Sequence, residues 1–224
     1  MAVASPARRV FLTGGTGYLG SRLIPLLAER GHSVRALIRA SSHAAVPDGC
    51  LPVSGDPLDL RTFVVNLQRG ETFIQLVGTP KPAPWKGPQF RAVDLVSGLA
   101  SIEAAKRAGA DHFIYVSVAH PAPIMKDYIG VRRECETALR QSGLRATIIR
   151  PWYVLGPGHW WPLFLKPGYW ICERILPLHE AALRLGLVTI DQMLATLIWA
   201  VEHPPESIRL IDVPEIRRLG SRAS

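Results

Sequence analysis

The sequence lacks any apolar run of about 18 residues, the length that a membrane-spanning helix requires. It also lacks, before its first strand, the apolar segment of a secretory signal peptide. Its three cysteines, Cys50, Cys135 and Cys172, are odd in number and show no C-x-x-C spacing. Such usage favours neither a zinc site nor a disulfide framework and suits a reducing compartment. We therefore expect a cytoplasmic protein without a membrane span.

The sequence also lacks the motifs of several classes of enzyme. We find no metal-ligand cluster, no pair of catalytic carboxylates and no Gly-x-Ser-x-Gly elbow. The net charge is +8, but the basic residues are scattered and form no long run interleaved with aromatics, which argues against nucleic-acid binding. Part of this charge would serve a phosphate-rich cofactor. With 48% apolar and 20% charged residues, the 224 residues are expected to fold as one domain, residues 1–224.

A glycine-rich turn is the most informative feature that is present. Thr13–Gly20 reads TGGTGYLG and lies between the apolar run Val10–Leu12 and an amphipathic segment, Leu19–Arg30. In a strand–turn–helix setting, glycines at this spacing give a tight turn, a backbone open to a pyrophosphate and close packing of the helix on the sheet. The pattern predicts a dinucleotide site whose cofactor-binding residues are Gly14, Thr16, Gly17, Tyr18, Leu19 and Gly20.

Alternating strand and helix patterns follow along the chain. Strands are expected at 10–12, 33–38, 50–53, 72–77, 112–118, 145–149, 187–190 and 207–212, and helices at 19–30, 58–67, 92–108, 127–142, 191–201 and 214–219. Asp191 is the expected N-cap of its helix. This alternation predicts an α/β fold, a Rossmann-type doubly wound parallel sheet with a short C-terminal extension. Ligands of such a sheet bind beyond the carboxyl ends of the strands.

The end of the second strand indicates the cofactor. NAD sites typically place an acid there for the ribose 2′-hydroxyl, but Val34–Ser42 contains no acid. Arg39 is well placed to bind a 2′-phosphate, with Arg35 as a second candidate and an exposed arginine as the alternative interpretation. The sequence favours NADP over NAD.

Several motifs occur in the order typical of one superfamily. They are Thr13–Gly20, Gly55-Asp56, Phe113–Ser117, Tyr128-x-x-x-Arg132, Arg150-Pro151 and Gly156-Pro-Gly158. The chain thereby resembles the atypical short-chain dehydrogenases/reductases, the NAD(P)H-binding group that includes NmrA-like regulators and complex I accessory subunits. The resemblance implies that Asp56 binds the adenine amino group and that Gly78 lies beside the ribose. It also implies that Pro151 and Val154 present backbone groups to the nicotinamide carboxamide.

The catalytic residues depart from the pattern of this family. Its dehydrogenases use Tyr-x-x-x-Lys on one helix face, with a serine or threonine from the fifth strand. Here Tyr128 is present, Arg132 occupies the lysine position and Ser117 is the candidate hydroxyl. Guanidinium is permanently charged but differs in shape from ammonium, so equivalence does not follow. Tyr128 is either the acid/base or a packing tyrosine, and His120 is a weaker candidate acid.

Residues 152–224 are expected to form the substrate side. Region 152–186 holds an aromatic cluster, Trp152, Tyr153, His159, Trp160, Trp161, Phe164, Tyr169 and Trp170. These rings suit a flat or apolar small-molecule substrate, or else cap the sheet or form a homodimer surface. The short C-terminal part predicts a pocket that is shallow or completed by a partner. The leading hypothesis is an NADPH-dependent oxidoreductase acting on an apolar carbonyl or quinone. Alternatives are a non-catalytic redox sensor or accessory protein and, less favoured, a nucleotide-sugar epimerase.

Overall fold

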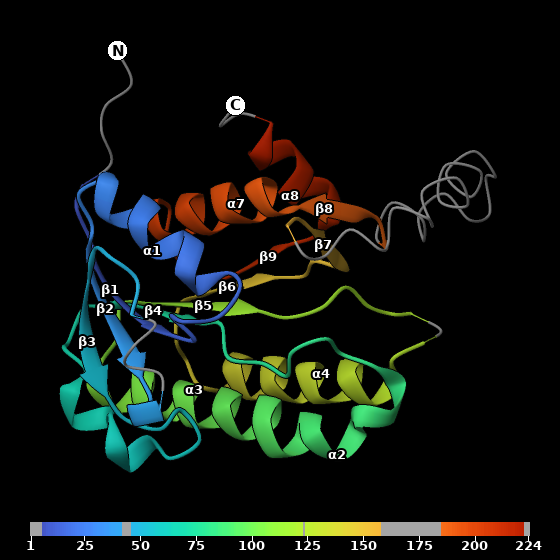
Figure 1. Cartoon of the computed structure of the whole chain (residues 1–224), viewed down its shortest axis with the longest axis horizontal. Coiled ribbons are helices and arrows are strands. Elements are labelled where there is room, and N and C mark those ends of the chain that lie inside the picture. The colour runs from blue at the N-terminus through green and yellow to red at the C-terminus, as the bar shows by residue number, and fades with distance from the viewer. Residues whose placement is uncertain (1–5, 42–45, 123, 158–184, 222–224) are drawn as a thin grey trace.

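Seven parallel strands form the central sheet, in the order β3-β2-β1-β4-β5-β6-β9 (Figure 1). The computed structural model describes residues 6–41, 46–122, 124–157 and 185–221. The strands are β1 Arg9–Thr13, β2 Ser33–Ile38, β3 Cys50–Ser54, β4 Thr72–Gln75, β5 His112–Val116, β6 Ala146–Ile149 and β9 Ile208–Ile211. Strand order reverses between β1 and β4, which is the switch point where such sheets bind ligands. The predicted Rossmann-type fold is confirmed.

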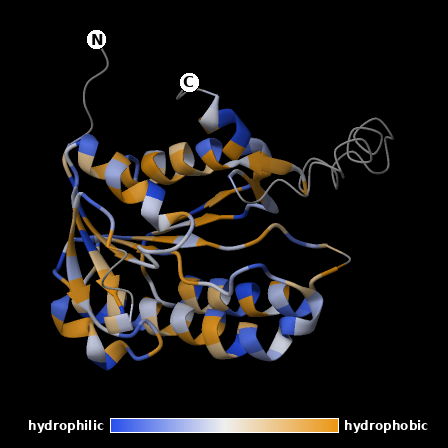
Figure 2. Ribbon diagram, in the orientation of Figure 1, coloured by the Kyte–Doolittle hydropathy of each residue, from blue (hydrophilic) through white to orange (hydrophobic). Residues whose placement is uncertain are grey.

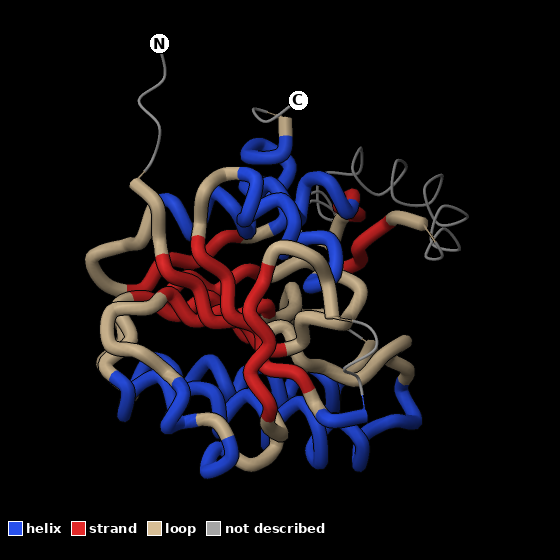
Figure 3. Tube along the Cα trace, turned by 60° about the vertical axis from the view of Figure 1, so that its left-hand side comes forward, coloured by secondary structure: helices blue, strands red, loops and turns tan. Residues whose placement is uncertain are grey.

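Helices cover both faces of this sheet (Figures 1 and 3). On one face lie α1 Gly20–Glu29, α7 Ile190–Glu202 and α8 Val213–Gly220. On the other lie α2 Gly87–Gln89, α3 Val96–Ala108 and α4 Lys126–Gln141. A separate two-stranded ladder pairs β7 Tyr153–Leu155 with β8 Leu187–Thr189. None of the described helices has the length and apolar character needed to span a bilayer.

The core has two halves, because successive side chains of a strand point to opposite faces. Val10 and Leu12 of β1 pack in the half beneath α1 and α7, whereas Phe11 packs in the half facing α3 and α4. In the second half, the rings of Phe73 and Phe113 from neighbouring strands stack with centroids 5.1 Å apart. Much of the sheet is accordingly hydrophobic, whereas hydrophobic and hydrophilic residues alternate along the helices (Figure 2).

Residues 58–67 do not form the predicted helix. They form two 3-10 turns, Leu60–Thr62 and Val64–Asn66. The Asp59 carboxylate accepts a hydrogen bond from the Arg61 amide at 3.1 Å, and the Thr62 hydroxyl donates to the Asp59 carbonyl at 2.7 Å. These side chain–backbone bonds compete with α-helical bonding, which the apolar spacing alone could not reveal.

Two helix starts also differ from the prediction. The segment predicted to begin at Ala92 begins at Gly87, continues as a π-helical stretch, Phe90–Leu95, and then becomes α3. Pro88 sits in the first turn of this helix, where a proline is tolerated. Thr189, and not Asp191, caps α7, because its hydroxyl accepts from the Gln192 amide in a capping box.

Candidate functional site

The glycine turn joins β1 to α1 through backbone atoms in direct contact. Gly14 has φ +78°, the left-handed region that favours glycine, and a Cβ there would lie 2.9 Å from the Leu76 carbonyl carbon. The Gly17 amide donates to the Gly14 carbonyl at 3.0 Å. A Cβ at Gly20 would lie 2.7 Å from the Gly15 Cα. The first and third glycines therefore serve the close packing of turn and helix, as the sequence predicts.

The N-terminus of α1 is electropositive and open. Its N-cap residue, Leu19, provides no side-chain hydrogen bond, and its first turn carries no acid. Arg22 lies over the Tyr18 ring at 4.4 Å and donates to the Tyr18 carbonyl at 2.9 Å. Gly17 is exposed, and a Cβ there would meet only the Gly14 carbonyl oxygen, at 3.1 Å. Free amides, the helix dipole and a side-chain-free backbone fit a pyrophosphate.

The two arginines of β2 have different surroundings. Arg35 donates to the buried carboxylate of Glu71 at 3.0 Å and to the Asn66 carbonyl at 2.6 Å. Arg39, directly after β2, is exposed and makes no hydrogen bond or ion pair with the described residues. Of these two arginines, Arg39 is therefore the one whose guanidinium could bind a ligand without breaking a hydrogen bond to the described residues. Of the neighbouring serines, Ser41 is exposed and Ser42 lies outside the described residues.

Asp56 and Gly78 occupy loops at the same sheet edge. The Asp56 carboxylate accepts from the Leu58 amide at 2.9 Å and so forms an Asx turn around Pro57, and the side chain is exposed. Gly78 follows β4, and a Cβ there would lie 2.6 Å from Nη2 of Arg132. A side chain at this position would therefore displace Arg132.

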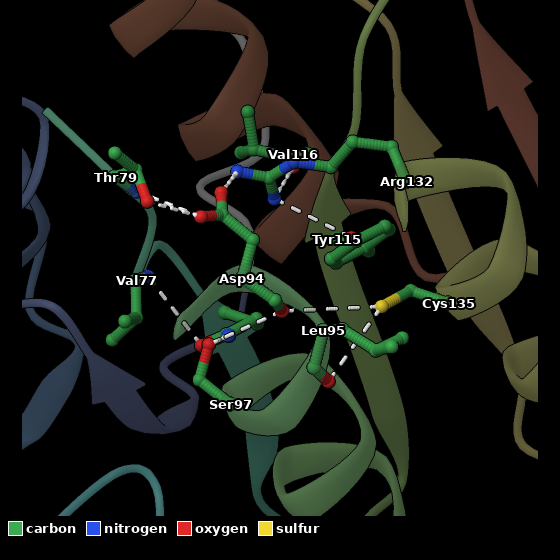
Figure 4. A network of polar contacts seen from close by, with 10 residues as sticks. Val77, Thr79, Asp94, Leu95, Ser97, Tyr115, Val116, Arg132 and Cys135 are labelled. Atoms are coloured by element: carbon green, nitrogen blue, oxygen red, sulfur yellow. Dashed lines mark hydrogen bonds and ion pairs between the residues drawn. The ribbon is translucent and has the colours of Figure 1, made fainter. Parts of the chain in front are cut away.

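A buried network links α4, the π-helical stretch and the loop after β4 (Figure 4). Nη2 of Arg132 donates to Oδ1 of Asp94 at 2.6 Å, and Nη1 donates to the Val116 carbonyl at 3.0 Å. Oδ2 of Asp94 accepts from the amide and the hydroxyl of Thr79, at 3.0 and 2.6 Å. Arg132 is 5% exposed and Asp94 is 0% exposed, so both charges depend on this pairing.

The electrostatics of the network follow from burial and pairing. Burial opposes the charge of Arg132, but the surrounding Tyr128, Tyr115 and Asp94 outweigh it and raise the pKa of the guanidinium further. Burial raises the pKa of the Tyr115 phenol well above its ordinary value, and the nearby Arg132 only partly offsets this. Nε of Arg132 is buried and has no hydrogen-bond partner among the residues that the structure describes. Arg132 therefore stays charged, and its Nε–H remains available as a hydrogen-bond donor.

Tyr128 is half-buried above this network. The Arg132 guanidinium lies over its ring, 5.0 Å from the centroid, and the Phe90 ring packs against it with centroids 5.0 Å apart. The Tyr128–Arg132 spacing thus brings the two side chains together, as predicted. Two contacts orient the phenol ring, while the exposed part of the side chain remains accessible.

Ser117 belongs to a second buried network. Its hydroxyl donates to Oε1 of Glu136 at 2.6 Å, and Nε of Arg150 donates to the same oxygen at 2.9 Å. Burial would raise the pKa of Glu136, but the bonds from Arg150 and Ser117 and the charge of Arg150 outweigh it and lower the pKa. Ser117 itself is 3% exposed. In this arrangement the hydroxyl fastens the end of β5 to α4.

The remaining candidates lie in the loops that follow β5 and β6. The Pro151 carbonyl accepts from the Ala119 amide at 2.9 Å, and Val154 pairs with Val188 in the β7–β8 ladder. Nδ1 of His120 lies 3.0 Å from the Val118 carbonyl, and burial lowers the pKa of this imidazole. Within the described residues, no group of three or more His, Cys, Asp and Glu side chains could hold a metal ion. The aromatic residues from His159 to Tyr169 and Trp170 lie outside the described residues.

Asp94 and Glu136 are buried carboxylates to which sequence reasoning assigned no role. Asp94 falls within a segment read only as a long helix, on the same face as the buried Phe90, Ser97 and Ser101. A carboxylate on a buried helix face requires a charged or hydrogen-bonding partner, so the position of Asp94 in the helical pattern is the signal that could have identified it. Glu136 lies four residues after Arg132, so the same helix supplies both networks.

The chain is similar to several known proteins. Residues 14–156 match a family model described as NAD(P)H-binding. The chain is 30% identical over 223 residues to the ceramide reductase of Caulobacter vibrioides, covering 97% of this chain and 68% of that protein. It is 25% identical over 170 residues to the 4-hydroxy-2-methyl-3-oxo-4-farnesyl-3,4-dihydroquinoline-1-oxide ketoreductase of Stigmatella aurantiaca, covering 66% of this chain and 51% of that protein. The chain thus spans from half to two thirds of these relatives.

Among solved structures, the fold is similar to that of the Bordetella bronchiseptica enzyme WbmH in complex with NAD+. The TM-score is 0.68, the identity is 22%, and the match covers 96% of this chain and 80% of that chain. This likeness shows the fold alone.

Proposed function

This chain belongs to the NAD(P)H-binding family of short-chain dehydrogenase/reductase-like oxidoreductases, and we propose that it is an NADPH-dependent reductase of an apolar carbonyl or quinone. The observation that carries the proposal is the open glycine turn before the uncapped N-terminus of α1, at the switch point of the sheet. Backbone amides of the turn between Gly14 and Gly20, other than the Gly17 amide that donates to Gly14, bind the pyrophosphate, and Arg39 binds the 2′-phosphate. The cysteine usage supports a cytoplasmic location.

Each remaining site residue has a proposed binding role. Asp56 binds the adenine amino group through its exposed carboxylate, and Gly78 passes its backbone beside the ribose. Pro151 and Val154 present backbone groups to the nicotinamide carboxamide, and the bond from the Ala119 amide to the Pro151 carbonyl holds this segment beside the loop after β5. Residues 152–224 supply the substrate side. The bound nucleotide supplies the hydride.

The proton comes from the Tyr128 phenol. The permanently charged guanidinium of Arg132, over its ring, favours the negative charge that develops on the phenol oxygen as the proton leaves. Asp94 and the Val116 carbonyl fix Arg132, so its geometry does not depend on ligand contacts. Ser117 acts as a positioning residue, because its hydroxyl is committed to Glu136.

The relatives support the substrate class. A ceramide and a farnesylated quinoline are the molecules in their names, and both combine an apolar chain with polar functional groups. We therefore place the substrate of this chain among amphiphilic carbonyl or quinone compounds, bound against Trp152 and Tyr153.

Single-turnover oxidation of NADPH, followed at 340 nm against a panel of long-chain ketones and quinones, tests this function. Tyr128→Phe, which keeps the ring contacts with Phe90 and Arg132, should reduce the rate by roughly 100-fold or more while NADPH binding stays unchanged. If the rate of Tyr128→Phe equals that of the wild type, the Tyr128 phenol is not the proton donor.

One observation favours a second function, that of a non-catalytic NAD(P)H-binding sensor or accessory protein. Arg132 and Ser117 are both committed to buried carboxylates, so neither is disposed as in the usual Tyr-Lys-Ser set. This alternative predicts tight NADPH binding without turnover of any substrate in the panel.

A further inference from the structure

Two loops at the carboxyl edge of the sheet carry large apolar side chains that are exposed to solvent. Trp85, in the Pro-rich loop after β4, is 80% exposed, and Ile124, in the loop after β5, is 58% exposed. The polar ring edge and apolar body of a tryptophan suit a membrane–water interface. No hydrogen bond or apolar packing within the described residues accounts for either position.

The Pro-rich loop ends beside α4, into which the loop after β5 leads (Figure 1). The short turn Pro84–Lys86 packs against α4, which begins two residues after Ile124. A Cβ at Gly87 would lie 2.6 Å from Oδ2 of Asp127, so the backbone after Trp85 rests on the first turn of α4. The Phe90–Tyr128 ring contact joins the same two segments one turn further along. Trp85 and Ile124 therefore belong to one surface.

Lysines concentrate around these two residues. The chain has five lysines and 21 arginines, and three of the lysines, Lys81, Lys86 and Lys126, lie in these loops or at the start of α4. Lys81 and Lys126 are exposed, whereas the Lys86 ammonium donates to the Pro80 carbonyl at 2.9 Å. Asp127 offsets one of the charges. Flexible ammonium groups beside exposed apolar residues are the composition of a surface that binds anionic headgroups.

We propose that Lys81, Trp85, Lys86, Ile124 and Lys126, here termed the Trp85 surface, dock the protein onto an anionic lipid bilayer. The surface includes the loop that leads into α4, so docking places the half-buried Tyr128 near the bilayer. An amphiphilic substrate then reaches the site from the membrane without crossing water. Docking itself is independent of the reductase activity, whereas this supply of substrate rests on the proposed function.

Co-sedimentation of the full chain with vesicles tests the proposal. The probes are vesicles of phosphatidylcholine alone and with 30% phosphatidylglycerol, at about 0.1 M salt. We expect binding to the anionic vesicles, weakened roughly tenfold or more by Trp85→Ala. Lys126→Glu should weaken it by roughly fivefold or more. Val65→Ala and Lys106→Glu are matched controls, because Val65 is 82% exposed and Lys106 is exposed on α3, and both should bind as the wild type does.

The outcomes are distinct. Absence of binding to anionic vesicles, or Trp85→Ala binding as the wild type does, overturns the proposal. A dimer that Trp85→Ala converts to monomer also overturns it, since the surface then binds a second copy. NADPH binding, measured in parallel, should be unchanged by Trp85→Ala and confirms that the variant is folded. If the wild-type protein does not bind NADPH, the proposed function is contradicted, whereas the proposal of vesicle docking is unaffected.

Discussion

Replacing Asp94 by Asn should destabilise the fold strongly, because it leaves Arg132 charged and buried. Arg132 is 5% exposed and donates to Asp94 at 2.6 Å, and the same carboxylate accepts both bonds from Thr79. Removing one partner of a buried ion pair costs about 3–5 kcal/mol. For a domain of this length that loss corresponds to a decrease of roughly 6–20 °C in melting temperature.

Urea unfolding, followed by circular dichroism, measures the effect. The matched control is Glu103→Gln, which removes the exposed Arg107–Glu103 ion pair of 2.7 Å on α3. That pair lies on the surface, and its loss should cost less than about 0.5 kcal/mol. Combining Asp94→Asn with Arg132→Gln should restore part of the stability, because no unpaired charge remains. If Asp94→Asn costs no more than Glu103→Gln, the buried network does not carry the role assigned to it.

Three further predictions follow from the site and the core. Burial lowers the pKa of His112 to about 3, so below pH 6.5 the unfolded chain binds a proton that the folded one does not, and stability falls by about 2 kcal/mol between pH 7 and pH 5. His112→Gln, which can keep a bond to the Thr147 hydroxyl, should flatten this slope in urea titrations, and an equal slope in both proteins would contradict it. Arg39→Gln should weaken NADPH binding roughly tenfold or more and leave NADH binding unchanged, by fluorescence titration; equal losses for both nucleotides would remove Arg39 from the 2′-phosphate site. Gly17→Val should abolish NADPH binding without unfolding the protein, whereas Gly130→Ala, with nothing within 4 Å of its Cβ, should change neither; binding retained in Gly17→Val would place the nucleotide elsewhere.

The sheet and the glycine turn could be predicted because their signals are local. Apolar runs bounded by turns gave β1, β2, β4 and β5, and the glycine spacing gave the packing of α1. The 3-10 turns after Asp59 could not be predicted from apolar spacing, since side chain–backbone bonds decide them. The sequence could not distinguish Thr189 from Asp191 as the cap of α7, because both residue types cap helices and only the backbone conformation separates them.

The chemistry of the candidate site was less predictable, because its partners are distant in sequence. Tyr128 and Arg132 share a helix face, so their contact follows from spacing. The pairing of Arg132 with Asp94 joins residues 38 positions apart, and that of Ser117 with Glu136 joins residues 19 apart. Only the packing of α4 against the π-helical stretch and the sheet brings them together.

Titration of the purified chain with NADPH and NADH by isothermal calorimetry tests the central claim most directly. The open turn and the uncapped N-terminus of α1 predict saturable binding of one dinucleotide per chain, tighter for NADPH than for NADH. Absence of heat with either nucleotide, in protein whose circular dichroism shows it to be folded, would contradict the claim that this turn is a dinucleotide site.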